Sequence, residues 1–265
     1  MKRKELVVFS MFMILSMSAC SADKSENVSN TKDLETISDE TVMEDISEAD
    51  NDTQDNASEE SQQLTGTSAD LDVLEDMILS DAENTVESLK SAQAALVAEI
   101  DSFDKYQKNI SKVEEYYSQV LTETQNLCIR MREYSIQYTE AILSSDKEND
   151  DKYDDLDGIY DCIYDDVGDD IYDGIYDELL DDMYDRFYDG VLDDAYDTVP
   201  YEDWSDAKSE EYEMWSDSKS DVYETWSDFR SDVYEFWSDM LGDMWDDDLE
   251  KVQETINDFR EDIAK

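Results

Sequence analysis

Apolar residues recur at fixed intervals of seven, four and eleven positions in three successive stretches, residues 70–145, 146–199 and 200–265. A strand alternates its side chains every two residues, whereas an α-helix returns to the same face every 3.6 residues, so these intervals favour helices. The chain also has only six glycines and one proline, which leaves little turn chemistry for an all-β fold. The pattern predicts an all-α fold of long amphipathic helices in an antiparallel hairpin or coiled-coil arrangement.

The seven-residue stretch, residues 70–145, predicts a coiled-coil-like helix. Its interval is kept by Leu89, Leu96, Phe103, Ile110, Tyr117, Thr124, Met131 and Tyr138 without an intervening glycine or proline. We expect one helix over about 72–143, ending at the polar run 144–150. Polar seam residues such as Gln93 and Thr124 make packing within the chain as favourable as a homo-oligomer, so the oligomeric state stays open.

The four-residue stretch, residues 146–199, repeats an apolar pair with aspartates between the pairs. The pairs are Ile159-Tyr160, Ile163-Tyr164, Ile171-Tyr172, Ile175-Tyr176, Leu179-Leu180, Met183-Tyr184, Phe187-Tyr188, Val191-Leu192 and Ala195-Tyr196. On an α-helix such a stripe drifts by about 40° at each step. We expect a helix over 151–198 that supercoils, changes register at its glycines, or is contacted on several sides. A β-hairpin at Asp173-Gly174 is the competing local prediction.

The eleven-residue stretch, residues 200–265, predicts a helix over 201–262. The residue before Pro200 is pushed out of the α region, while proline itself suits the first turn of a helix. Trp204, Trp215, Trp226 and Trp237 follow eleven residues apart. A period of eleven keeps a helical stripe nearly straight.

These tryptophans belong to an aromatic ladder in which a base and then a tyrosine follow at four-residue steps. The ladder comprises Trp204, Lys208, Tyr212, Trp215, Lys219, Tyr223, Trp226, Arg230, Tyr234, Trp237 and Trp245. The spacing puts Trp, cation and Tyr on one side of a helix, where cation–π contacts can form. The favoured alternative has the bases bonding to aspartates of the preceding helix. Aromatic residues at helical spacing are usually core, so we expect the four tryptophans of the repeat and the seven tyrosines of residues 160–196 to form the seam between the last two helices, with glycan binding as the competing interpretation.

The N-terminus has the layout of a secretory signal: a cationic start, an apolar run of about 12 residues, and small residues before a cysteine. The ending Met17-Ser18-Ala19-Cys20 resembles the lipobox of bacterial lipoproteins. The resemblance implies a signal peptide over 1–19, a lipid-bearing Cys20, and a protein anchored at the extracytoplasmic face of a bacterial membrane. A transmembrane anchor and a signal cleaved without lipidation are the alternatives. Residues 20–69 are polar and acidic, which predicts a disordered linker.

The acidic excess is concentrated in the last 120 residues, which carry 44 acidic and nine basic side chains and so contribute −35 of the chain's net charge of −54. Such a surface repels nucleic acid and favours a basic protein, a polycation or divalent cations as partners. The densest carboxylates, and therefore the candidate weak cation sites, are Asp165, Asp166, Asp169, Asp170, Asp181, Asp182, Asp193 and Asp194. A solvated face with diffuse counter-ions is the competing interpretation.

Signatures of catalysis are missing from the sequence. There is no histidine, no nucleophile elbow and no phosphate loop. The run from Asp151 to Gly158 superficially resembles an EF-hand loop, but aligning Gly158 with the loop glycine puts Tyr153 and Tyr164 where Asp and Glu are needed. We therefore expect no catalytic residues, no specific metal site and no cofactor beyond weakly bound Ca²⁺.

Cys128 and Cys162 each lie 17 residues from Ser145. If residues 70–143 and 151–198 form an antiparallel hairpin that turns there, the two cysteines lie nearly level. An extracytoplasmic compartment permits disulfides, so the spacing predicts a Cys128–Cys162 bond, with two unrelated buried thiols as the alternative.

These patterns together predict a lipid-anchored, acidic, helical protein with a structural, spacer or protein-binding role and no enzymatic activity. The alternative function is low-affinity binding of, or response to, divalent cations.

Overall fold

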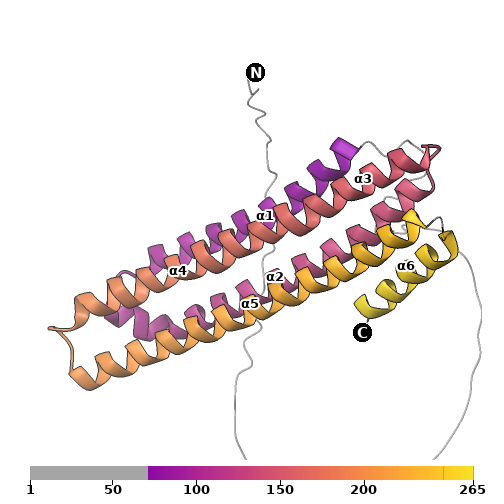
Figure 1. Cartoon of the computed structure of the whole chain (residues 1–265). Helices are drawn as coiled ribbons and strands as arrows, with labels where there is room; N and C mark the ends of the chain where they lie inside the picture. The colour runs from indigo at the N-terminus through magenta and orange to yellow at the C-terminus, as the bar shows by residue number, and fades with distance from the viewer. Residues whose placement is uncertain (1–70, 247, 265) are drawn as a thin grey trace, which may run out of the picture. The chain divides into compact units, whose positions relative to one another are not determined.

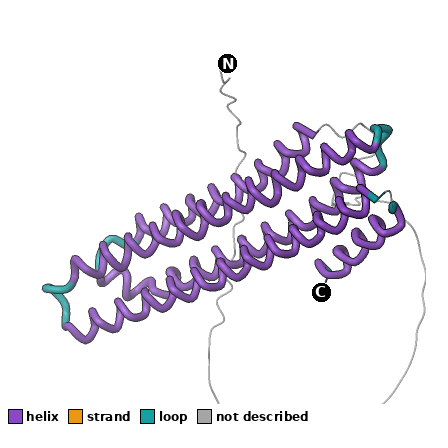
Figure 2. Tube along the Cα trace, in the orientation of Figure 1, coloured by secondary structure: helices purple, strands orange, loops and turns teal. Residues whose placement is uncertain are grey.

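The computed structural model describes residues 71–246 and 248–264, all of which belong to one compact unit. Every regular element among them is a helix, joined by short loops (Figures 1 and 2), so the all-α prediction is confirmed. The predicted signal peptide, the lipobox with Cys20, and the linker of residues 20–69 lie outside the described residues.

The first hairpin of the bundle consists of α1 (Leu71–Glu99) and α2 (Phe103–Leu143). Ion pairs between Asp81 and Arg130 and between Glu99 and Lys112 show that the two helices run antiparallel.

The second hairpin begins with a long helical segment, residues 149–195, which we call the tetrad helix. It consists of α3 (Asn149–Asp161), η1 (Cys162–Val167), η2 (Asp170–Leu179), α4 (Leu180–Tyr184), η3 (Asp185–Leu192) and η4 (Asp193–Ala195). The segments η1, η2 and η3 are π-helical, and η4 is a 3₁₀ turn.

The hairpin is completed by α5 (Tyr201–Trp245), which runs antiparallel to the tetrad helix. A last helix, α6 (Leu249–Ile263), folds back on α5, where the rings of Phe236 and Phe259 stack with centroids 4.4 Å apart. Figure 1 shows α6 at one end of the bundle beside α5.

The two hairpins pack with α1 beside the tetrad helix and α2 beside α5 (Figure 1). The pair Lys90–Glu178 and the pair Arg132–Asp232 join these parallel neighbours. The middle of the tetrad helix therefore faces α1 and α5, and α2 lies diagonally across the bundle from it.

The tetrad helix keeps its four-residue period by widening its turns. A π-helix bonds i to i+5, so its turns take in more residues than the 3.6 of an α-helix, and a mixture of the two averages about four. Each position of the tetrad then stays on one side. The core row, with at most 1% of each residue exposed, is Ile159, Ile163, Val167, Ile171, Ile175, Leu179, Met183 and Phe187.

The other three rows have equally distinct surroundings. The next residue of each tetrad, most often tyrosine, faces α5, and the one after it is an aspartate on the exterior. The fourth faces α1, where Gly174 meets Val86 and Glu178 pairs with Lys90. The competing hairpin at Asp173-Gly174 is wrong, because both residues lie inside η2.

The predicted single helix over 70–145 is divided in two at residues 100–102. Ser102 has extended backbone angles (φ −158°, ψ 159°) and starts α2. Leu96 and Phe103 stay buried on either side of the break, so the seven-residue spacing continues across it. The periodicity consequently contains no sign that the chain reverses direction there.

The predicted helix over 201–262 is also divided, because α5 ends at Trp245 and α6 starts at Leu249. The side chain of Asp248 accepts a hydrogen bond from the Lys251 backbone N–H at 3.3 Å. Aspartate at this position satisfies an N–H group that the first helical turn leaves unpaired.

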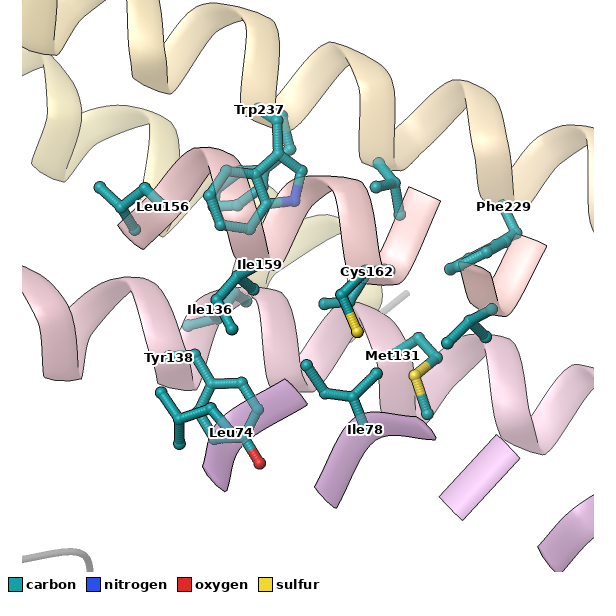
Figure 3. Packing of buried hydrophobic residues seen from close by; sticks show 14 of the residues in the cluster. Leu74, Ile78, Met131, Ile136, Tyr138, Leu156, Ile159, Cys162, Phe229 and Trp237 are labelled. Atoms are coloured by element: carbon teal, nitrogen blue, oxygen red, sulfur yellow. The ribbon is translucent and has the colours of Figure 1, made fainter. Parts of the chain in front are cut away.

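The core consists of two apolar clusters that follow one another along the bundle. Figure 3 shows part of the cluster at the α6 end, where side chains from α1, α2, the tetrad helix and α5 converge. The labelled residues are Leu74, Ile78, Met131, Ile136, Tyr138, Leu156, Ile159, Cys162, Phe229 and Trp237.

Candidate functional site

The seam between the tetrad helix and α5 is the most regular arrangement of side chains in the described residues. Tryptophans eleven residues apart on α5 meet tyrosines twelve residues apart on the tetrad helix. The pairs, with their ring-centroid distances, are Trp204–Tyr196 at 4.9 Å, Trp215–Tyr184 at 4.5 Å, Trp226–Tyr172 at 4.8 Å and Trp237–Tyr160 at 6.2 Å. Twelve residues of the widened helix thus match eleven residues of α-helix, which rise about 16.5 Å.

The three bases of the ladder bind into this seam. Each lies over a tyrosine of the tetrad helix and pairs with an exterior aspartate of the same helix. Lys208 Nζ lies 3.3 Å from the Tyr188 centroid and 2.5 Å from Asp193; Lys219 Nζ lies 4.0 Å from Tyr176 and 2.9 Å from Asp181; Arg230 Cζ lies 3.9 Å from Tyr164, and its Nη2 lies 3.3 Å from Asp165. The tryptophans of α5 itself are farther from these cations, at 5.5–5.8 Å. The bases therefore use the preceding helix for both contacts.

Neighbouring side chains also satisfy the backbone of the tetrad helix. A change from π-helical to α-helical bonding leaves a carbonyl without a helical partner. Carbonyl oxygens at the ends of the three π-helical stretches accept hydrogen bonds from other helices. Trp226 Nε1 donates to Gly168 at 2.8 Å, Gln93 Nε2 to Leu179 at 2.9 Å, and Trp204 Nε1 to Leu192 at 2.8 Å.

The fourth layer of the ladder differs from the first three. Leu241 stands where the base would be, and the indole N–H of buried Trp237 has no hydrogen-bond partner in the described part of the chain. Trp245 does not enter the seam, since it is 79% exposed and contacts Tyr153 edge-on at 6.2 Å.

The ladder tyrosines of α5 lie outside the core. Tyr212, Tyr223 and Tyr234 are all exposed, whereas the tryptophans meet the tyrosines of residues 160–196, as the expected seam requires. The three exposed tyrosines occupy the outer edge of the seam, where Tyr223 approaches Tyr176 at 5.9 Å. The burial of aromatic rings here is carried by the tryptophans and by the tyrosines of the tetrad helix.

The candidate cation sites are divided by the structure. The first aspartate of each predicted pair at 165, 169, 181 and 193 lies within 4 Å of a base of α5, although for Asp169 this is the second carboxylate around Arg230. The remaining candidates, Asp166, Asp170, Asp182 and Asp194, occupy the row that faces α1. Neighbouring aspartates in the chain thus point to different surroundings.

The face between the tetrad helix and α1 gathers like charges. Burial and then the nearby Glu83 carboxylate raise the pKa of Asp170, and burial with neighbouring Asp72 and Asp166 raises that of Glu75. Among the described residues, however, no three carboxylates or thiols converge closely enough to hold a metal ion.

Cys128 and Cys162 are separate buried thiols, so the predicted disulfide is wrong. The prediction required α2 and the tetrad helix to lie side by side, whereas Cys162 begins η1, whose neighbours are α1 and α5. Figure 3 shows the Cys162 sulfur among apolar side chains that include Ile78 and Met131. Burial raises the pKa of each thiol to about 12.

Glu211 is a buried carboxylate that the sequence analysis missed. None of its surface is exposed, and it accepts hydrogen bonds from Tyr106 at 2.8 Å and Tyr117 at 2.7 Å, both on α2. Burial raises its pKa to about 7, and the two tyrosine hydroxyls oppose that rise. The signal was present in the repeat, because the equivalent positions, one and two repeats later, are Val222 and Val233.

Two surface grooves lie at the α6 end of the bundle. One, of about 540 Å³, is lined by carboxylates such as Glu235 and Asp239 around Phe236 and Phe259. The other, of about 730 Å³, is lined by residues that include the exposed Trp245.

No protein family matches the sequence, and neither the curated proteins nor the solved structures contain a significant match. Among the described helices, none is both long enough and apolar enough to cross a bilayer.

Proposed function

We propose that the chain is a lipid-anchored protein of the extracytoplasmic face of a bacterial membrane, whose acidic bundle acts as a spacer and binds basic proteins without catalysis. The resemblance of the Met17-Ser18-Ala19-Cys20 ending to a lipobox supports the anchor. Two acyl chains on Cys20 would hold the protein stably at the membrane.

The binding role is supported by the placement of the basic side chains of the second hairpin. Lys208, Lys219 and Arg230 already form ion pairs with aspartates of the tetrad helix and lie over its tyrosines. Residues 146–265 carry 44 acidic and nine basic side chains, so a large excess of carboxylates is left on the outside. Such a field attracts basic macromolecules and accelerates their association.

The rigid seam supports the spacer role. Trp–Tyr contacts join the two helices from Trp204 to Trp237, a rise of about 50 Å along α5. The alternative function, binding of divalent cations, receives less support, because the candidate aspartates are divided between two faces in the described structure.

Lipidation and partner binding are tested separately. In a bacterial host fed an alkyne fatty acid, the wild-type chain should take up the label and stay with the membrane fraction, whereas Cys20→Ser should be unlabelled and released. A membrane-bound, unlabelled wild type would contradict the anchor. The binding role predicts that the bundle binds a basic protein in a titration and that binding weakens steeply between 50 and 150 mM salt.

A further inference from the structure

Five aromatic residues of α5 form an exposed row at strict eleven-residue intervals. We call this the outer aromatic row; its members, with their exposed fractions, are Tyr201 at 67%, Tyr212 at 51%, Tyr223 at 47%, Tyr234 at 56% and Trp245 at 79%. An eleven-residue period keeps them close to one face of the helix, about 16.5 Å apart. Packing within the bundle does not account for this row, because about half or more of each residue faces solvent.

The rings of the row are held in place from beneath. Tyr201, Tyr212 and Tyr223 each contact the tryptophan three residues later, with centroids 5.5–5.7 Å apart. Those tryptophans are fixed in turn by the seam. The outward ring faces are therefore preordered, which reduces the entropy lost when a partner binds.

Unpaired carboxylates flank the row on both sides. Each row residue is followed in the chain by an exposed acid, and these are Glu202, Glu213, Glu224, Glu235 and Asp246. On the tetrad helix, the exterior aspartates Asp161, Asp173, Asp185 and Asp189 are also exposed, as is Asp197 just beyond its end. None of these ten side chains forms an ion pair with a Lys or Arg of the described residues.

The buried side of the same seam shows what such a combination binds. There, a tyrosine ring and an aspartate together hold one cation in each of three successive layers, at Lys208, Lys219 and Arg230. The outer aromatic row presents the same two groups, ring and carboxylate, at the same spacing. It lacks only the cation.

We propose that the outer aromatic row is the docking surface for a lysine- or arginine-rich polypeptide, whose cationic side chains stack on the exposed rings. The proposal rests on the basic-partner role proposed above and locates it on one face. A second copy of this chain is disfavoured as the occupant, because the same acidic flanks would face each other. Arginine fits better than lysine, since its planar guanidinium stacks on aromatic rings while bonding carboxylates.

The test measures binding of fluorescein-labelled deca-arginine and deca-lysine to the mature protein by fluorescence anisotropy at 150 mM salt. Two triple variants at Tyr212, Tyr223 and Tyr234 are compared. Tyr→Phe keeps the ring faces, while Tyr→Leu keeps apolar bulk and removes them. Circular dichroism checks that both variants retain the helical fold.

Wild type and the Phe triple should bind alike and prefer deca-arginine, and the Leu triple should bind deca-arginine at least tenfold more weakly, because it lacks three cation–π contacts. A charge control compares Glu213→Gln, Glu224→Gln and Glu235→Gln with Asp104→Asn, Glu114→Gln and Glu115→Gln on the exposed face of α2. The row set should weaken binding more than the α2 set.

Three results would overturn parts of this inference. Undiminished binding by a folded Leu triple, or equal effects of the two charge sets, would show diffuse attraction and refute the row while leaving the basic-partner role intact. If the Leu triple loses its helical fold, the charge sets decide alone. Absence of binding by the wild type would refute both the row and the basic-partner role.

Discussion

Glu211 allows a quantitative test of how the bundle tolerates a buried charge. It lies in the core between α5 and α2 with hydrogen bonds from Tyr106 and Tyr117 and no basic partner in the described residues. Its pKa is raised from the ordinary 4.5 to about 7, and each pKa unit corresponds to about 1.36 kcal/mol. Ionised Glu211 therefore costs about 3 kcal/mol of folding free energy at pH values above 7.

The sign of the pH dependence follows from the raised pKa. Between pH 4.5 and about 7 the native state keeps a proton that the unfolded state has lost, so stability falls as the pH rises through this window. Glu211→Gln is neutral at every pH and lacks this loss. We expect the stability difference between the Gln variant and the wild type to grow in favour of Gln by about 2.5 kcal/mol from pH 5 to pH 8.

Urea denaturation followed by circular dichroism at intervals between pH 5 and pH 8 measures this difference. Taking the difference between two proteins cancels the titration of the other carboxyls. The exposed Glu213→Gln is the matched control and should parallel the wild type across the range. Parallel pH profiles for the wild type and Glu211→Gln would refute the assignment of Glu211 as a buried carboxyl with a raised pKa.

Three further predictions concern the seam, the thiols and helix propensity. Lys219→Met should destabilise the protein by about 1–2 kcal/mol in urea denaturation, because an ion pair and a cation–π contact are lost together, whereas Lys105→Met, which breaks an exposed pair, should cost about 0.5 kcal/mol or less. An equal loss of stability for both variants would mean that the seam cation contributes no more than an exposed ion pair. Peptide mapping after treatment with a thiol reagent should find Cys128 and Cys162 unmodified until denaturant is added, since both are buried with raised pKa values; a cross-linked peptide would instead reveal the disulfide. Gly242→Ala should stabilise the protein by about 0.5–1 kcal/mol, because a Cβ there meets no atom within 4 Å, and a lower melting temperature would contradict this.

The sequence predicts where the helices of this bundle lie in the chain better than it predicts which helices pack against each other. The fold class, the loop near Ser145 and the start of α5 after Pro200 follow from periodicity and breaker residues. The break at 100–102 could not be predicted from them, because the seven-residue spacing passes through it unchanged. Diagonal placement of α2 and the tetrad helix is likewise invisible to local patterns, and the disulfide prediction failed for that reason.

Within the candidate site, the spacing identified the residues of the aromatic ladder but not which of them face the tetrad helix and which face solvent. The eleven-residue repeat placed Lys219 and its equivalents next to an acidic helix, and their aspartate contacts follow from that. Tyr223 and its equivalents look like core residues in the same repeat, yet they are exposed, because the wider tetrad helix supplies its own tyrosines to the seam. No single-helix pattern contains that information, since it depends on how two different periods meet.

Because eleven residues of α5 match twelve residues of the tetrad helix, the two helices could align in more than one register. Sliding α5 by one repeat would bring three of the four seam tryptophans to the next tyrosine and preserve most ring contacts, so the repeat alone stabilises several alignments. The irregular positions distinguish them. Moving Glu211 away from Tyr106 and Tyr117 would leave its buried carboxyl without hydrogen-bond donors. Moving Leu241 into the position of Arg230 would leave an aspartate without its cation. The two departures from the repeat thus select one alignment among near-equivalent ones.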